Sequence, residues 1–94
     1  MAVNKLLVTM PYMMISTLIR LETGPTIVGD ERADLDVMNH LGAQLVQSVG
    51  NPFKEWVVEL PPRMVLNKLE EIGYKVVGTA GIGQTAIWTL HKAK

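Results

Sequence analysis

The chain has no cysteine and only two histidines among its 94 residues. Without cysteine it has no disulfide framework, no thiolate nucleophile and no cysteine-ligated zinc. The N-terminal residues do not fit the pattern of a secretory signal peptide, because the apolar run Leu6-Leu7-Val8 is short and no small-residue cleavage site follows it. These absences favour an intracellular protein.

The chain also has no excess of positive or negative charge. Nine lysine and arginine residues balance nine aspartate and glutamate residues, and neither sign forms a run, so the sequence gives no sign of a nucleic-acid binder. The most apolar stretch, residues 6–21, is broken by Pro11, Arg20 and several hydroxyl residues. It therefore predicts no transmembrane segment.

The composition is rich in apolar residues, which make up 48% of a chain long enough for one small domain. Such a chain has more apolar surface than a core of its size readily buries, which favours an oligomer. We expect residues 1–9 to be an N-terminal extension or an extra strand, and residues 10–94 to form a single domain.

The alternation of apolar residues predicts strands at residues 5–21, 26–28, 43–49, 53–60, 74–79 and 85–91. One helix is expected from an N-cap at Asp34 to Gly42, with Leu35, Met38 and Leu41 on its apolar face. A second helix should follow Pro61-Pro62 and end at Gly73. This order predicts an α+β fold, a mostly antiparallel sheet of about six strands with two helices on one face.

Two single residues invite a choice between interpretations. His40 lies near the end of the first predicted helix without a cluster of carboxylates in sequence, which favours a solvated histidine over a metal ligand. Trp56 alternates with charged residues in its strand and is predicted to belong to the core.

The segment Gly81-Ile82-Gly83-Gln84-Thr85 joins the last two predicted strands, and its glycines allow the backbone to present bare N–H groups. Its spacing Gly81-x-Gly83-x-x-Ala86 loosely matches a dinucleotide fingerprint, but a strand rather than a helix follows, so that interpretation fails. A binding loop and a simple hairpin turn both remain open.

The charged residues Arg20 and Glu22 lie near the end of the first predicted strand. They could hold a zwitterion, with the guanidinium facing a carboxylate and the carboxylate facing an ammonium group, or they could form an exposed salt bridge. The remaining titratable groups are scattered over different elements, which argues against catalysis and for a binding module.

A series of short motifs runs in order along the chain: Met10-Pro11-Tyr12, Ile15-Ser16-Thr17, Ile19-Arg20, Gly24-Pro25-Thr26, Val28-Gly29-Asp30-Glu31, Pro61-Pro62-Arg63, Val65-Leu66, Lys68-Leu69-Glu70, Gly81-x-Gly83-Gln84-Thr85 and Leu90-His91-Lys92. Together they resemble the GTP cyclohydrolase I feedback regulatory protein family, and the resemblance covers residues 10–92. It implies a non-enzymatic, allosteric homopentamer that binds GTP cyclohydrolase I, the first enzyme of tetrahydrobiopterin synthesis. It also implies a cytoplasmic protein, with the nucleus as a second compartment.

The resemblance also implies the signals that such a regulator relays. Tetrahydrobiopterin promotes an inhibited complex, phenylalanine promotes a stimulated complex, and no cofactor is required. The implied phenylalanine-binding residues at the enzyme interface are Ile19, Arg20, Glu22, Gly81, Ile82, Gly83, Gln84 and Thr85. Two rival hypotheses are a free-standing amino-acid-sensing domain that acts on another partner, and a small enzyme assembled at subunit boundaries with His91 or Glu22 in its site.

Overall fold

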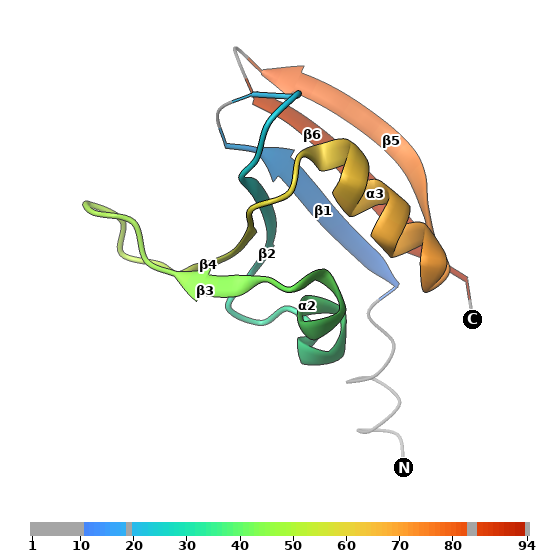
Figure 1. Ribbon diagram of the computed structural model, residues 1–94, viewed down its shortest axis with the longest axis horizontal. Helices are drawn as coiled ribbons and strands as arrows, with labels where there is room; N and C mark the ends of the chain where they lie inside the picture. Colours follow the sequence, from blue (N-terminus) through green and yellow to red (C-terminus); the bar gives the residue numbers. More distant parts are fainter. Residues whose placement is uncertain (1–10, 19, 83–84, 94) are drawn as a thin grey trace.

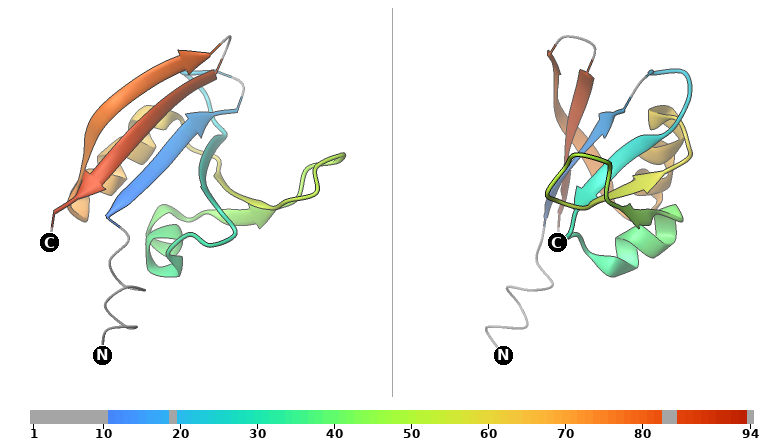
Figure 2. Two further views of the ribbon diagram at one scale, coloured as in Figure 1. Left: turned by 180° about the vertical axis from the view of Figure 1, so that it is seen from behind. Right: turned by 90° about the vertical axis from the view of Figure 1, so that its left-hand side faces the viewer.

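The computed structural model describes residues 11–18, 20–82 and 85–93. Its strands form one six-stranded sheet in the order β3-β4-β2-β1-β6-β5, and every neighbouring pair is antiparallel. The two helices lie on one side of this sheet (Figures 1 and 2). The predicted α+β fold is therefore confirmed. The strands are β1 (Tyr12–Thr17), β2 (Thr26–Asp30), β3 (Gln44–Val46), β4 (Glu55–Val58), β5 (Tyr74–Ile82) and β6 (Thr85–Lys92), and the helices are α2 (Leu35–Leu41) and α3 (Pro62–Glu71).

Helix α2 begins and ends as its sequence predicts. The Asp34 carboxylate accepts hydrogen bonds from the backbone N–H groups of Asp36 at 2.8 Å and Val37 at 3.4 Å. Gly42 ends the helix with a φ of 73°, a conformation that glycine adopts without steric cost. The predicted apolar face is wrong at its first position, because Leu35 is 62% exposed and Val37 is buried instead.

Helix α3 begins at Pro62, whose fixed φ suits the first helical turn. N–H groups in this turn have no acceptor within the helix, so proline, which lacks an N–H, costs no hydrogen bond there. Val65 and Leu69, one turn apart, are completely buried against the sheet. Gly73 follows the helix with a φ of 99°, so the predicted stop is confirmed.

The core lies between the sheet and the two helices. Trp56 and Trp88 are half-buried and pack against it, which confirms the prediction for Trp56. The buried apolar residues are Ile15, Val28, Val37, Met38, Leu41, Val58, Val65, Leu69, Tyr74 and Leu90.

Several strand boundaries differ from the predictions. In the stretch predicted as strand over residues 5–21, the described strand is β1, Tyr12–Thr17, and residues 5–10 lie outside the described part. Strands β3 and β4 are shorter than predicted, because the chain between them, residues 47–54, turns at Ser48–Asn51 rather than pairing. Strand β2 reaches Asp30 rather than residue 28, and β5 reaches Ile82 rather than residue 79.

Candidate functional site

The candidate site lies at one end of the sheet. Strand β1 pairs antiparallel with β6, and Ser16 lies opposite Ile87, so the end of β1 lies beside the start of β6. The β1–β2 connection and the β5–β6 hairpin consequently occupy the same end of the molecule, at the top of Figure 1. The connection that carries Arg20 and Glu22 thus lies at the same end of the sheet as Gly81, Ile82 and Thr85.

Two buried threonines fix the β1–β2 connection in place. The Thr17 hydroxyl oxygen accepts a hydrogen bond from the backbone N–H of Ala86 at 2.9 Å, which ties the end of β1 to β6. The Thr26 hydroxyl donates to the carbonyl of Leu60 at 2.7 Å. Both side chains are nearly inaccessible, so these bonds are made in a low-dielectric environment and position the connection firmly.

Gly24 allows the connection to approach a neighbouring segment closely. A Cβ atom at this position would lie 2.2 Å from the carbonyl oxygen of Glu59. The peptide bond to Pro25 is cis. Only glycine fits so close to that backbone, and the connection is therefore packed against the chain that leads into α3.

Arg20 and Glu22 form an ion pair between Arg20 Nη1 and Glu22 Oε1 at 3.9 Å. Both side chains are about two-thirds exposed, at 68% and 70%, so the pair is weak and open to competition from a ligand. Of the two interpretations that the sequence left open, the geometry in the absence of a ligand is the exposed salt bridge.

The β5–β6 connection is shorter than the sequence predicted. Gly81 and Ile82 belong to β5 and pair with Ala86 and Thr85, so these residues are strand rather than loop. A Cβ at Gly81 would meet only Thr85 O at 3.8 Å, and its φ is not positive, so neither space nor conformation requires glycine there. Ile19, Gly83 and Gln84 lie outside the described residues.

Two exposed leucines also lie on the β1–β2 connection, and our sequence-based list of site residues omitted them. Leu18 is 48% exposed and Leu21 is 55% exposed, on either side of Arg20. Apolar side chains that flank a charged pair can cover the apolar part of a ligand whose polar end the charges hold. Apolar and charged residues alternate in this part of the sequence, and this alternation was interpreted as a continuation of the first strand.

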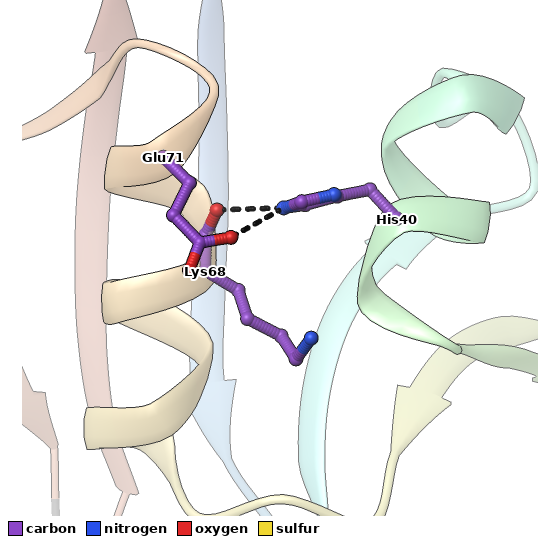
Figure 3. Close-up of polar contacts among 3 residues, drawn as sticks. All are labelled: His40, Lys68 and Glu71. Atoms are coloured by element: carbon purple, nitrogen blue, oxygen red, sulfur yellow. Dashed lines mark hydrogen bonds and ion pairs between the residues drawn. The ribbon is translucent and has the colours of Figure 1, made fainter.

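His40 is not the solvated side chain that the sequence predicted. Its Nε2 atom lies 2.9 Å from the carbonyl oxygen of Lys68 and 3.4 Å from Glu71 Oε1, and the side chain is 30% exposed (Figure 3). The ring thus links α2 to α3. In the described part of the chain, no three histidine, cysteine or acidic residues are grouped as metal ligands would be.

A cavity of about 890 Å³ opens at the other end of the sheet from the two connections. It lies among the start of β1, the end of β2, the start of α2 and the start of β4, and it is lined by residues such as Met13, Val28, Met38 and Phe53. Of the predicted site residues that the structure describes, none lines it.

The fold and the site define a single-sheet α+β domain whose candidate binding end is built from two chain connections. Within the described ranges, no helix combines the length and apolar character that a membrane crossing requires.

The chain belongs to the family described as GTP cyclohydrolase I feedback regulatory protein (GFRP), which it matches over residues 11–93. The resemblance drawn from the sequence motifs is therefore confirmed. Residues 1–10 lie outside this match.

Three relatives carry the name "GTP cyclohydrolase 1 feedback regulatory protein". The chain is 59% identical over 83 residues to the protein of Danio rerio, which covers 88% of this chain and 93% of the relative. It is 58% identical to the protein of Xenopus laevis and 57% identical to that of Xenopus tropicalis, over 88% of this chain and 99% of each relative.

Proposed function

We propose that this chain is a non-catalytic regulator that binds GTP cyclohydrolase I and mediates its inhibition by tetrahydrobiopterin and its stimulation by phenylalanine. The observation that carries the proposal is the match to the regulatory family over residues 11–93, with relatives of that name at 57–59% identity. The two effectors come from the family resemblance, as do the homopentameric assembly and the cytoplasmic and nuclear location.

A regulator of this kind acts through differential binding rather than chemistry. Each effector must bind one state of the regulator–enzyme assembly more tightly than another, because equal affinity for both states shifts no equilibrium. Coupling of about 1–3 kcal/mol, or roughly 5-fold to 150-fold in affinity, is usual for such effects. By linkage, phenylalanine must then also strengthen the association of regulator with enzyme.

Phenylalanine would bind at the end of the sheet that carries the two connections. Its carboxylate and ammonium groups can replace the partners in the weak Arg20–Glu22 pair, which stand 3.9 Å apart and two-thirds exposed. Leu18 and Leu21 offer apolar cover for the ring. We retain Ile19, Gly81, Ile82, Gly83, Gln84 and Thr85 as the further predicted contacts.

Co-elution tests the proposal. The chain is mixed with its cognate cyclohydrolase and passed over a size-exclusion column with and without phenylalanine, and the GTP dependence of the enzyme is measured under the same conditions. We expect a complex that phenylalanine stabilises and a shift of the enzyme towards activity at lower GTP. Absence of both effects would refute the proposal, and strong phenylalanine binding to the isolated chain by calorimetry would support the free-standing sensor instead.

A further inference from the structure

The pairing of β1 with β6 ends where the two connections of the candidate site begin, at the top of Figure 1. The last pair of this register is Ser16 opposite Ile87. Beyond it, one chain continues towards Arg20 and Glu22, and the other leads back to the β5–β6 hairpin. The relative position of the two connections therefore depends on what holds the strands together at this end of the sheet.

Thr17 makes a contact of this kind with its side chain. It is the residue after Ser16, and its hydroxyl oxygen accepts a hydrogen bond from the N–H of Ala86 at 2.9 Å. Ala86 follows Thr85 directly and pairs with Gly81 across the β5–β6 hairpin. One hydroxyl oxygen thus links the last residue of β1 to the strand pair that carries Gly81 and Thr85.

Burial strengthens this hydrogen bond. Thr17 is 3% exposed, so little water reaches its hydroxyl to compete for the N–H of Ala86. A methyl group of valine would fill the same space but could accept no hydrogen bond, and a buried donor that loses its acceptor is destabilising. The contribution that distinguishes threonine at this position is therefore the acceptor.

The β1–β2 connection is anchored at both of its ends. Thr17 anchors the start to β6, and Thr26, which pairs with Thr17 across β1 and β2, anchors the end by donating to the Leu60 carbonyl at 2.7 Å. Arg20 lies three residues after the first anchor and six before the second. The bond to β6 is therefore the nearer constraint on the Arg20 backbone.

We propose that the Thr17 hydroxyl is a positioning group for the effector site. By accepting the N–H of Ala86, it sets how the connection that carries Arg20 and Glu22 stands relative to the β5–β6 hairpin. This role rests on the proposed function, because the site that Thr17 positions is the one we assign to phenylalanine. Thr17 is too buried to contact the effector and acts on its affinity through the groups that do.

Two substitutions separate the hydroxyl from the bulk of the side chain. Thr17→Val keeps the shape and removes the acceptor, whereas Thr17→Ser keeps the acceptor and removes a methyl group. We expect Thr17→Val to raise the phenylalanine concentration for half-maximal stimulation of the enzyme about fivefold, with the maximal stimulation retained. Thr17→Ser should stay within about twofold of the natural chain.

Val28→Ala is the control for lost stability. Val28 is 1% exposed on β2 and lines the cavity at the other end of the sheet. Its truncation destabilises the fold without touching the two connections, so the half-maximal phenylalanine concentration should remain that of the natural chain. Urea unfolding of all three variants identifies the conditions under which each is folded.

Hydrogen exchange measures the contact in the isolated regulator, without enzyme or effector. Thr17→Val should speed exchange at the Ala86 amide roughly tenfold, and Thr17→Ser should keep its protection. The amide of Leu90, which lies opposite Met13 further along β6, should be unchanged in both variants.

Unchanged exchange at Ala86 in Thr17→Val would overturn the proposal. So would a normal phenylalanine response in Thr17→Val, or an equal loss of response in Thr17→Ser or Val28→Ala, and these results would leave the proposed function intact if the natural chain responds. A natural chain without any phenylalanine response would instead overturn the proposed function, and the positioning role would fall with it.

Discussion

At the scale of single residues, Gly24 has the tightest surroundings of the described glycines. Its missing Cβ would lie 2.2 Å from Glu59 O and 2.6 Å from Glu59 C, both backbone atoms that cannot rotate away. Gly24→Ala should therefore lower the free energy of unfolding by about 2 kcal/mol or more.

Urea unfolding of Gly24→Ala beside Gly78→Ala measures this effect. Gly78 has no atom within 4 Å of its would-be Cβ, so that variant should stay within about 0.5 kcal/mol of the natural chain. Equal unfolding midpoints for the two variants would contradict the packing argument.

Arg20 and Glu22 should matter for the effector rather than for the fold. Because the pair is two-thirds exposed, Arg20→Gln or Glu22→Gln should change the free energy of unfolding by less than about 0.5 kcal/mol. If the pair holds phenylalanine, loss of one charge-assisted hydrogen bond should weaken the phenylalanine response about tenfold.

The phenylalanine concentration for half-maximal stimulation of the enzyme is the quantity to measure. Arg32→Gln serves as the matched control, because Arg32 is an exposed arginine that lines the cavity at the other end of the sheet. A normal response in both Arg20→Gln and Glu22→Gln would remove these residues from the site.

At the scale of elements, the contact between α2 and α3 depends on His40. Its ring bridges the Lys68 carbonyl and the Glu71 carboxylate, which joins two helices that the sequence presents as separate amphipathic segments. His40→Ala should cost about 1 kcal/mol, because the buried side of the Lys68 carbonyl loses its partner.

Thermal unfolding of His40→Ala, Glu71→Gln and the double variant measures the coupling in that bridge. Asn39→Ala is the control on the same helix, since Asn39 is exposed. Equal stability of the His40→Ala and Asn39→Ala variants would contradict a bridging role for His40.

The surroundings of Tyr74, at the start of β5, predict a pH dependence. Burial, and secondarily the charge of Asp34, raises the pKa of Tyr74 above its ordinary value of 10.0. The unfolded chain then releases this proton at lower pH than the folded chain. The stability that the neutral phenol provides is complete below about pH 10 and is lost as the pH rises above it towards the folded pKa.

The free energy of unfolding, measured from about pH 9 to about pH 11, should show this loss, because the range brackets the ordinary tyrosine pKa. Tyr74→Phe should reduce the slope of stability against pH in that range, whatever its effect on stability at neutral pH. An unchanged slope in Tyr74→Phe would show that another group causes the alkaline loss.

At the scale of the whole molecule, the sheet has helices on one side only. On β1, Tyr12 and Met14 point away from the core and are 64% and 61% exposed, while Ile15 is buried. Strand β5 forms one edge of the sheet, and it carries Val76 and Val77, which are 44% and 59% exposed beside an irregularity in its pairing with β6. Exposed apolar surface of this kind, on an open sheet face and edge, is typical of the contacts between subunits of an oligomer.

The family resemblance predicts that the assembly is a homopentamer. Sedimentation equilibrium at micromolar concentration should then give a mass near five times the 10.4 kDa of one chain. A mass that stays at that of one chain over the whole concentration range would contradict a ring.

Local chemistry explains which elements could be predicted. The Asp34 cap, the Pro62 start and the glycine stops act within a turn of chain, so the sequence placed both helices well. Strand ends depend on which neighbour pairs with them. Gly81 and Ile82 were predicted as loop from composition, yet Ala86 and Thr85 pair with them and extend β5.

The sequence by itself determined the family, the α+β class, both helices and most of the strands, because motifs, caps and alternation are properties of neighbouring residues. Only the tertiary structure decided which distant residues meet. It placed the connection that carries Arg20 and Glu22 at the same end of the sheet as the β5–β6 hairpin through the antiparallel pairing of β1 with β6, and it joined His40 to α3. Such contacts depend on strand order and helix packing, which no local pattern in the chain encodes.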